Sequence, residues 1–326
     1  MRRQPYRMLD LHARQFVSAA SAALFSTWTF PEDRCLSRPE AVAATVFEQR
    51  DIDVDGVRLR YVDQGPGKGS RPLLPPVVIL PGHTARIEDY DALVPMLSAD
   101  RRLLLPDLPG KGYAGKPIRH YDFAYYEDSV IGFLDALGVG QVDLVGGSLG
   151  ANLALRLAHR EPSRVRRVVA WAPGSLTKPR PRLARAIRAA GRFPPAVRLA
   201  LQIHSRFWFS PGYPGRDAAL RDKFAHYREV MGPGFAAMYA GMAADSVGSS
   251  LLPLAPAIGQ PTLLLVGSLD EGGGVQAGIR RLQRRLPRAD LRVVDGAGHS
   301  LLAEALETVV TAISGFLNAS EPSGHL

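Results

Sequence analysis

The sequence predicts an α/β fold: a mostly parallel, eight-stranded sheet with helices on both faces and an inserted helical cap. Two features of the pattern support this class. Short, continuously apolar runs alternate with longer helical segments, as they do where helical crossovers join parallel strands. The alternation stops at Gly174 and resumes after about Ala257, and helical pieces broken by prolines fill the interval. We therefore expect residues 174–257 to form the cap.

The first expected elements form an antiparallel pair. Residues 46–54 and 57–62 alternate apolar and polar side chains around Asp55-Gly56, a dipeptide that suits a two-residue hairpin turn. Further apolar runs indicate strands, and the segments between or after them indicate helices. The runs are residues 77–80, 103–105, 142–145, 165–171, 262–266 and 291–294; the helical segments are 88–97, 123–137, the segment after residue 148, 275–286 and 301–317.

Length and composition are those of an ordinary globular protein. It has 326 residues, of which 46% are hydrophobic and 22% charged, so it can bury a large core. We divide it into an N-terminal extension (residues 1–44), a core in two parts (45–173 and 258–318) around the cap, and a C-terminal tail (319–326).

The chain is basic, with 40 Lys and Arg against 31 Asp and Glu. An excess of this sign is compatible with an acidic substrate, a membrane surface or nucleic acid. The arginines are spread over the whole length and no nucleic-acid-binding motif accompanies them, so we expect no nucleic-acid partner. In the cap, Arg182, Arg185, Arg188 and Arg192 recur at helical spacing, which is typical of a solvated helix face.

The N-terminal extension has features of a poor signal peptide. A mildly apolar segment, residues 16–30, follows four arginines, but serines and threonines interrupt it and no clear cleavage site follows. We expect a helix that packs on the body or lies on a membrane surface. No stretch reaches the ~18 to 20 apolar residues that a membrane span needs. Cys35 is the single cysteine, so no intrachain disulfide is possible and a reducing compartment is compatible. We expect a cytoplasmic protein. We expect it to be a monomer or a dimer.

The candidate nucleophile lies in a G-x-S-x-G pentapeptide, residues 146–150. An apolar run leads into it and an Ala- and Leu-rich helical segment follows, so Ser148 would lie on a tight strand-to-helix turn. A side chain at Gly146 or Gly150 would collide where strand and helix nearly touch. The pentapeptide alone is a weak signal, because chance produces it often in a chain rich in glycine and serine.

Two further residues strengthen the prediction. A serine hydroxyl needs a base, and the base needs an orienting acid. His299 follows the last predicted strand in a glycine-rich loop, and Asp270 follows the strand before it. The order Ser148, Asp270, His299 is the order of nucleophile, acid and base on such a sheet. Glu271 is an alternative acid, and each residue taken singly also fits a structural role as helix start, turn former or loop histidine.

The chain resembles the α/β-hydrolase superfamily, specifically its capped single-domain esterase-like group. The resemblance rests on these three residues, on the glycine-bearing turn Leu80-Pro81-Gly82-His83 and on the Asp-Leu-Pro-Gly-x-Gly stretch at 107–112. The resemblance covers about residues 46–317. It implies an oxyanion hole made by the N–H groups of His83 and Leu149. Many relatives have histidine where this chain has Pro81 and Gly147, and we expect altered packing there.

The expected function is a serine hydrolase that cleaves a carboxylic ester, lactone or thioester of a small to medium, largely apolar molecule through an acyl-enzyme. Acyl transfer, cyclisation or lyase chemistry on the same triad remains an alternative, as does a ligand-binding relative without turnover. No phosphate loop, dinucleotide motif or Cys/His cluster occurs, so we expect no cofactor and no metal. Asp107 and Asp143 are expected to be structural.

Overall fold

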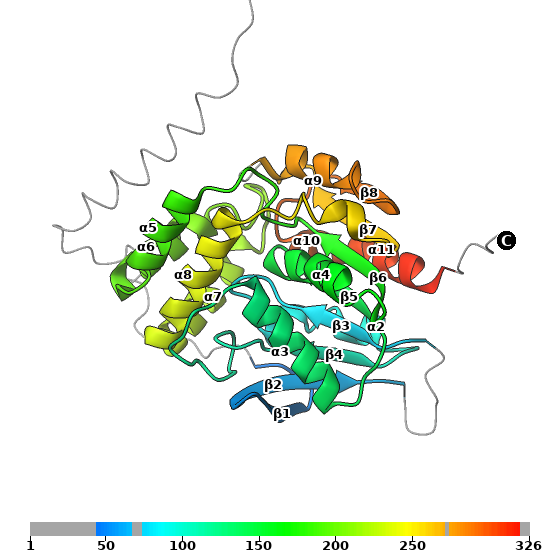
Figure 1. Ribbon diagram of the computed structural model, residues 1–326, viewed down its shortest axis with the longest axis horizontal. Helices are drawn as coiled ribbons and strands as arrows, with labels where there is room; N and C mark the ends of the chain where they lie inside the picture. The colour runs from blue at the N-terminus through cyan, green and yellow to red at the C-terminus, as the bar shows by residue number, and fades with distance from the viewer. Residues whose placement is uncertain (1–43, 67–73, 271–273, 320–326) are drawn as a thin grey trace, which may run out of the picture. The chain divides into compact units, whose positions relative to one another are not determined.

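The computed structural model describes residues 44–66, 74–270 and 274–319. These residues form an eight-stranded sheet in the order β1-β2-β4-β3-β5-β6-β7-β8 (Figure 1). β2 pairs antiparallel with β1 and β4, and all other neighbours are parallel. The predicted fold class is therefore confirmed. The strands are β1 (Gln49–Val54), β2 (Val57–Gln64), β3 (Val77–Leu80), β4 (Leu103–Pro106), β5 (Val142–Gly147), β6 (Val165–Trp171), β7 (Thr262–Gly267) and β8 (Ala289–Val294).

The hairpin between β1 and β2 has the predicted two-residue turn. Asp55 and Gly56 both have positive φ, 52° and 76°, which is the backbone of a turn that matches the twist of paired strands. β1 begins three residues later than expected, at Gln49, and the side chain of Val46 is exposed to solvent. Pairing with β2 starts only at Gln49, which lies opposite Val62.

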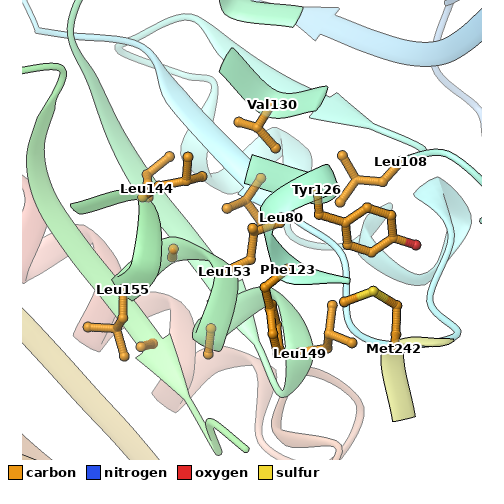
Figure 2. Close-up of a cluster of buried hydrophobic side chains, with 14 of the residues drawn as sticks. Leu80, Leu108, Phe123, Tyr126, Val130, Leu144, Leu149, Leu153, Leu155 and Met242 are labelled. Carbon is orange, nitrogen blue, oxygen red and sulfur yellow. The ribbon is translucent and has the colours of Figure 1, made fainter. Parts of the chain in front are cut away.

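Side chains of the parallel strands point alternately to two hydrophobic clusters, one on each face of the sheet. Val78, Leu80 and Leu144 pack in one cluster with residues of α3 and α4, as Figure 2 shows for Leu80, Leu144, Phe123 and Leu153. Val77, Ile79 and Val145 pack in the other with residues of α2 and α11. Both faces are buried, which explains why these strands are continuously apolar in sequence.

Helices and 3₁₀ turns connect the strands and cover both faces (Figure 1). They are η2 (Ile87–Tyr90), α2 (Val94–Leu97), α3 (Phe123–Ala136), α4 (Leu149–Arg160), α5 (Pro181–Ala190), α6 (Pro194–Ser205), α7 (Arg216–Val230), α8 (Pro233–Gly248), η3 (Ala255–Ala257), α9 (Val275–Gln283), α10 (Leu301–Glu304) and α11 (Leu306–Asn318).

Two predicted helices are broken in the structure. The single helix expected at 88–97 is wrong: η2 ends at Tyr90 and α2 starts afresh, with Pro95 in its first turn. Proline has no N–H to donate to the carbonyl four residues back, so one continuous helix is disfavoured here. The closing helix expected at 301–317 is also interrupted, at Ala305, whose φ of −151° and ψ of 47° are not helical.

Between β6 and β7 the chain is helical, and we call α5–α8 the helical insertion. α5 packs mainly on α8 and buries no residue fully. Arg182, Arg185 and Arg192 are exposed, as a solvated basic face predicts, whereas Arg188 is half-buried and donates to the carbonyl oxygen of Tyr121 at 3.1 Å.

Several expectations lie outside the described residues: those for the extension up to residue 43, for Cys35, for Glu271 and for the last residues of the tail. Within the described ranges, no helix combines the length and apolar character that crossing a membrane requires.

Candidate active site

Ser148 occupies the turn between β5 and α4 with a strained backbone. Its φ of 55° and ψ of −115° are unusual for a residue with a Cβ. Its N–H donates to the carbonyl oxygen of Trp171 at 2.8 Å, and its own carbonyl accepts from Asn152 N–H at 3.2 Å. These bonds hold the serine between strand and helix, the backbone arrangement of a nucleophile elbow.

The glycines on either side permit this turn, as the sequence predicts. A Cβ on Gly146 would lie 2.5 Å from the carbonyl carbon of Gly150. A Cβ on Gly150 would collide with the carbonyl oxygen of Leu80 in β3. No larger residue fits at either position without moving backbone atoms.

His299 and Asp270 are brought together by loops at the carboxyl ends of β8 and β7. Nδ1 of His299 lies 2.8 Å from Oδ2 of Asp270. The Asp270 side chain is 1% exposed and the His299 side chain 22% exposed. The carboxylate therefore lies behind the imidazole, where it can hold the ring in one orientation.

One pocket adjoins both His299 and Ser148, because both residues line it. Its wall is mostly apolar and aromatic, and comes from the strand ends and from the helical insertion. The lining includes Gly82, His83, Thr84, Ala85, Asp89, Tyr90, Gly147, Trp171, His204, Trp208, Phe209, Ala219, Lys223, Ser300, Leu301, Leu302 and Ala303. Trp208 and Phe209 are the two aromatic residues that the segment between α6 and α7 contributes to this lining.

Residues 81–86, which we call the β3 loop, run beside Ser148. A Cβ on Gly82 would lie only 3.9 Å from the Cβ of Ser148. His83 follows in this loop, and Leu149 is the first residue of α4, whose N–H has no acceptor within the helix. The two predicted oxyanion donors thus belong to segments that adjoin the serine.

The side chain of His83 is held by the helical insertion. Its Nε2 lies 2.9 Å from the carbonyl oxygen of Tyr239, and its ring stacks on the Tyr239 ring with centroids 4.6 Å apart and planes 5° from parallel. Burial, with smaller effects from His204 and Lys111, lowers the pKa of His83 to about 3. Its imidazole is therefore neutral at pH 7 and forms part of the pocket wall.

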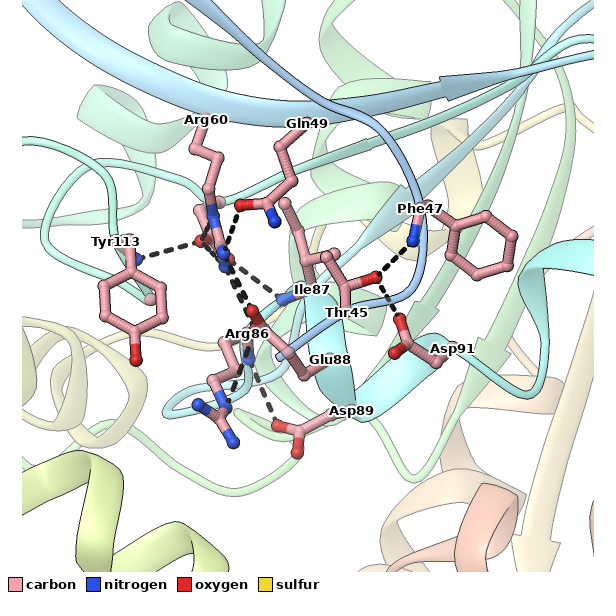
Figure 3. Close-up of polar contacts among 12 residues, drawn as sticks. Thr45, Phe47, Gln49, Arg60, Arg86, Ile87, Glu88, Asp89, Asp91 and Tyr113 are labelled. Carbon is pink, nitrogen blue, oxygen red and sulfur yellow. Dashed lines mark hydrogen bonds and ion pairs between the residues drawn. The ribbon is translucent and has the colours of Figure 1, made fainter. Parts of the chain in front are cut away.

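A buried ion cluster holds the segment directly after the β3 loop (Figure 3). Arg60 donates to Asp107 at 2.8 Å and to Glu88 at 2.7 and 3.0 Å. Asp107 also accepts from the backbone N–H groups of Ile87 at 3.0 Å and Tyr113 at 2.9 Å. Asp107 thus holds two loops together, which confirms its predicted structural role.

Three polar contacts join α7 to the segment that contains the β3 loop. Arg86 donates to both carboxylate oxygens of Asp222, at 2.9 and 2.7 Å. Lys223 donates to Asp89 at 2.9 Å, and the hydroxyl of Tyr227 to that of Thr84 at 2.9 Å. We call these contacts the α7 latch.

On the opposite side, Glu304 connects the His299 loop to the insertion. One of its carboxylate oxygens, Oε2, accepts from the N–H groups of Gly298 and Ser210, both at 3.0 Å. Gly298 directly precedes His299. This contact also marks the end of α10, where the predicted continuous helix is interrupted.

Two other sequence expectations have clear outcomes. Asp143 is fully buried and bonded to Arg101 at 3.1 Å and Arg166 at 2.8 Å, so it is structural. At Gly147, where many relatives have histidine, the indole of Trp171 fills the space that a Cβ would need. Altered packing is therefore the outcome at this position.

Sequence reasoning missed the polar residues of the pocket wall other than the proposed site residues. His204 and Lys223 come from helices whose sequence has no motif, so no local signal identifies them. Desolvation, with His299 contributing, lowers the pKa of His204 to about 4. Trp171 was accessible to prediction, because it is the last residue of β6 and lies at the same sheet edge as Ser148.

Comparisons with known proteins agree with the fold described above. Residues 75–198 match a family model described as alpha/beta hydrolase fold. The chain is 30% identical over 285 residues to a 2-hydroxymuconate semialdehyde hydrolase of Pseudomonas putida, covering 82% of this chain and 93% of the relative. It is 29% identical to a poly(3-hydroxyalkanoate) depolymerase of Ectopseudomonas oleovorans, covering 82% and 92%. Among solved structures, an enol-lactonase from Burkholderia xenovorans superposes with a TM-score of 0.71 at 22% identity, over 83% of this chain and all of that one.

Proposed function

Because this chain belongs to the α/β-hydrolase superfamily, we propose that it is a serine hydrolase cleaving a carboxylic ester, lactone or thioester. One observation carries the proposal. The imidazole of His299, paired with buried Asp270 at 2.8 Å, lines the same pocket as Ser148 on its strained turn. That arrangement suits a nucleophile, a base and an orienting acid.

In the proposed mechanism, Oγ of Ser148 attacks the substrate carbonyl carbon while His299 takes the hydroxyl proton. Asp270 stabilises the resulting imidazolium and keeps Nδ1 protonated. The carbonyl oxygen becomes negative and accepts from the N–H groups of His83 and Leu149. His299 then gives its proton to the leaving alcohol or thiol, and water attacks the acyl-enzyme by the same steps to release the acid and free Ser148.

The pocket wall supports a largely apolar acyl or alcohol group. Trp171, Trp208, Phe209, Leu301 and Leu302 are among the hydrophobic residues that line it. Apolar groups of a substrate leave water when they contact these side chains, which favours binding. The histidines His83 and His204 have pKa values lowered to about 3 and 4, so they add no positive charge at pH 7.

The test is labelling with a fluorophosphonate and mapping of the modified peptide, together with turnover of p-nitrophenyl esters of graded acyl length. We expect label on Ser148, and its loss in Ser148→Ala. Ser300→Ala, which changes another serine of the pocket wall, should still take the label. Folded wild-type protein that takes no label at Ser148 and turns over no ester would contradict the proposal.

A second candidate is hydrolytic cleavage of a carbon–carbon bond beside a carbonyl group. It is favoured by the match to a 2-hydroxymuconate semialdehyde hydrolase, whose named substrate is an aldehyde acid and not an ester. A further relative, 28% identical, is named 2-hydroxy-6-oxo-2,4-heptadienoate hydrolase. An assay with that dienoate distinguishes the two candidate functions, and its cleavage is monitored as a loss of absorbance. Turnover of the dienoate at a far higher kcat/KM than any ester would favour the second.

A further inference from the structure

Lys111, in the loop after β4, is buried. The residue is 1% exposed, which is rare for lysine because an ammonium group loses free energy when it leaves water. Its Nζ donates to the carbonyl oxygens of Pro81 and Gly82, both at 2.8 Å, and lies 5.0 Å from the centre of the Tyr126 ring. Lys111 is not among the residues that line the described pocket, and both acceptors of its hydrogen bonds belong to the β3 loop.

One acceptor of Lys111 belongs to the peptide group that carries a proposed oxyanion donor. The carbonyl oxygen of Gly82 and the N–H of His83 are the two ends of a single peptide unit. A hydrogen bond to the oxygen polarises that unit, and the N–H at its other end becomes a stronger donor. A positive charge beside the unit further stabilises negative charge that develops on the substrate oxygen.

The bonds from Lys111 also help to fix the orientation of the Gly82–His83 peptide, together with two further bonds nearby. Gly82 N–H donates to the hydroxyl of Tyr90 at 3.0 Å, and Ala85 N–H donates to Gly82 carbonyl oxygen at 3.3 Å. Without Lys111, the Gly82 oxygen keeps only the longer bond from Ala85. The plane of the Gly82–His83 peptide, which sets the direction of the His83 N–H, would then be less well restrained. Catalysis is sensitive to small displacements of such groups.

We propose that Lys111 is a positioning residue for catalysis, which holds and polarises the Gly82–His83 peptide so that its N–H is aimed at the transition-state oxyanion. The inference rests on the function proposed above. Lys111 acts through the β3 loop and does not touch the substrate.

The charge of Lys111 gives the proposal a pH signature. Burial lowers the pKa of Lys111 to about 7, although attraction to Asp107 partly opposes this shift. The protonated form is the better donor and the only charged one, so kcat should decline as the pH rises from 7 to 9. A variant without an ionisable group at position 111 should lack this decline.

The test compares Lys111→Met with Lys116→Met. Lys116 is a matched control, because its Nζ also donates to two backbone carbonyls, those of Gly112 at 2.7 Å and Ala114 at 3.0 Å, but not to the β3 loop. We expect Lys111→Met to lower kcat by about 10- to 100-fold, less than the ~10² to 10³ lost with a whole oxyanion donor. KM should stay within about threefold, the alkaline decline should vanish, and Lys116→Met should keep both kcat and the decline.

Fluorophosphonate labelling separates failure of this inference from failure of the proposed function. Lys111→Met should still take one label at Ser148, but more slowly by the same factor as kcat. Unchanged kcat in labelled Lys111→Met overturns the role of Lys111 and leaves the hydrolase proposal intact, whereas an unlabelled, inactive wild type overturns the hydrolase proposal. If the methionine variant does not fold, Lys111→Gln takes its place: its amide can still donate a hydrogen bond, so kcat should fall less than in the methionine variant, but the alkaline decline should still vanish. If neither folds, a wild-type kcat that is flat from pH 7 to 9 overturns the inference.

Discussion

Nδ1 of His299 lies 2.8 Å from Oδ2 of Asp270, although 29 positions separate the two residues in the chain. The acid is enclosed, and of the two residues only His299 lines the pocket. The carboxylate can therefore act on the reaction only through the ring, by fixing its tautomer and by stabilising its protonated form.

Replacing the acid by its amide tests this relationship. We expect Asp270→Asn to lower kcat by about 10⁴-fold with little loss of folded protein, because an amide keeps the shape but favours the wrong tautomer of the histidine. The measurement is steady-state turnover of the best ester. Asp295→Asn is the control: Asp295 lies in the same loop as His299, but its carboxylate accepts from the hydroxyl of Ser268 at 3.1 Å. Similar losses in both variants would show that the loop and not the pairing is responsible.

The α7 latch should contribute to stability. Arg86 is 2% exposed and its partner Asp222 31% exposed, so removing the carboxylate charge leaves a buried guanidinium less well paired. We expect Asp222→Asn to lower the free energy of unfolding by about 1 to 2 kcal/mol, at the low end for charged hydrogen bonds because Asp222 is partly solvated. Chemical denaturation provides the measurement. Asp217→Asn, an exposed position on the same helix, should change the value by less than about 0.5 kcal/mol.

Buried His226 should make the protein less stable in acid. Burial, followed by repulsion from Arg86, lowers the pKa of His226 to about 3, below the ordinary value of 6.5. Between these values the unfolded chain binds the extra proton, so stability falls as the pH falls from 6.5 toward 3, by at most about 1.4 kcal/mol per pH unit. In His226→Leu the fall between pH 6.5 and 4.5 should be shallower than in the wild type. Loss of the ring contact with Tyr113 shifts the whole curve equally, so the slope is the readout, and parallel curves would refute the assignment.

The close approach of β3, β5 and α4 predicts intolerance at Gly150. A Cβ there collides with the backbone oxygen of Leu80, and backbone atoms of a central strand have little room to move. We expect Gly150→Ala to cost about 3 kcal/mol or more of unfolding free energy, measured by denaturant titration or as lost soluble yield. Gly140→Ala is the control, because a Cβ on Gly140 meets no atom within 4 Å. A stable Gly150→Ala protein would mean that strand and helix separate more easily than this packing implies.

Much of the fold and the order of the candidate site residues could be predicted from sequence, because both depend on local patterns. Apolar runs placed the parallel strands, and the carboxyl ends of such strands meet at one edge, so Ser148, Asp270 and His299 were expected to converge there. The break before α2 could also have been predicted, because Pro95 lacks the N–H that a continuous helix needs at this position.

The supporting contacts could not be predicted. A lysine in an Asp-Leu-Pro-Gly-Lys-Gly stretch has the same local sequence whether it is exposed or, like Lys111, buried under another loop. Arg86 and Asp222 are 136 positions apart, and neither lies in a motif that indicates its partner. Such pairs depend on how the helical insertion packs on the sheet, which periodicity does not encode.

The helical insertion is anchored on both sides of the proposed active site: the α7 latch reaches the β3 loop, and Ser210 shares Glu304 with the residue before His299. Exchanging this insertion for that of a homologue would therefore sever bonds that orient the reacting groups. Chimeras designed to alter selectivity should transplant residues 84–89 and position 304 along with the donor helices. For the proposed hydrolase, selectivity and turnover are therefore expected to be coupled traits that have to be engineered together.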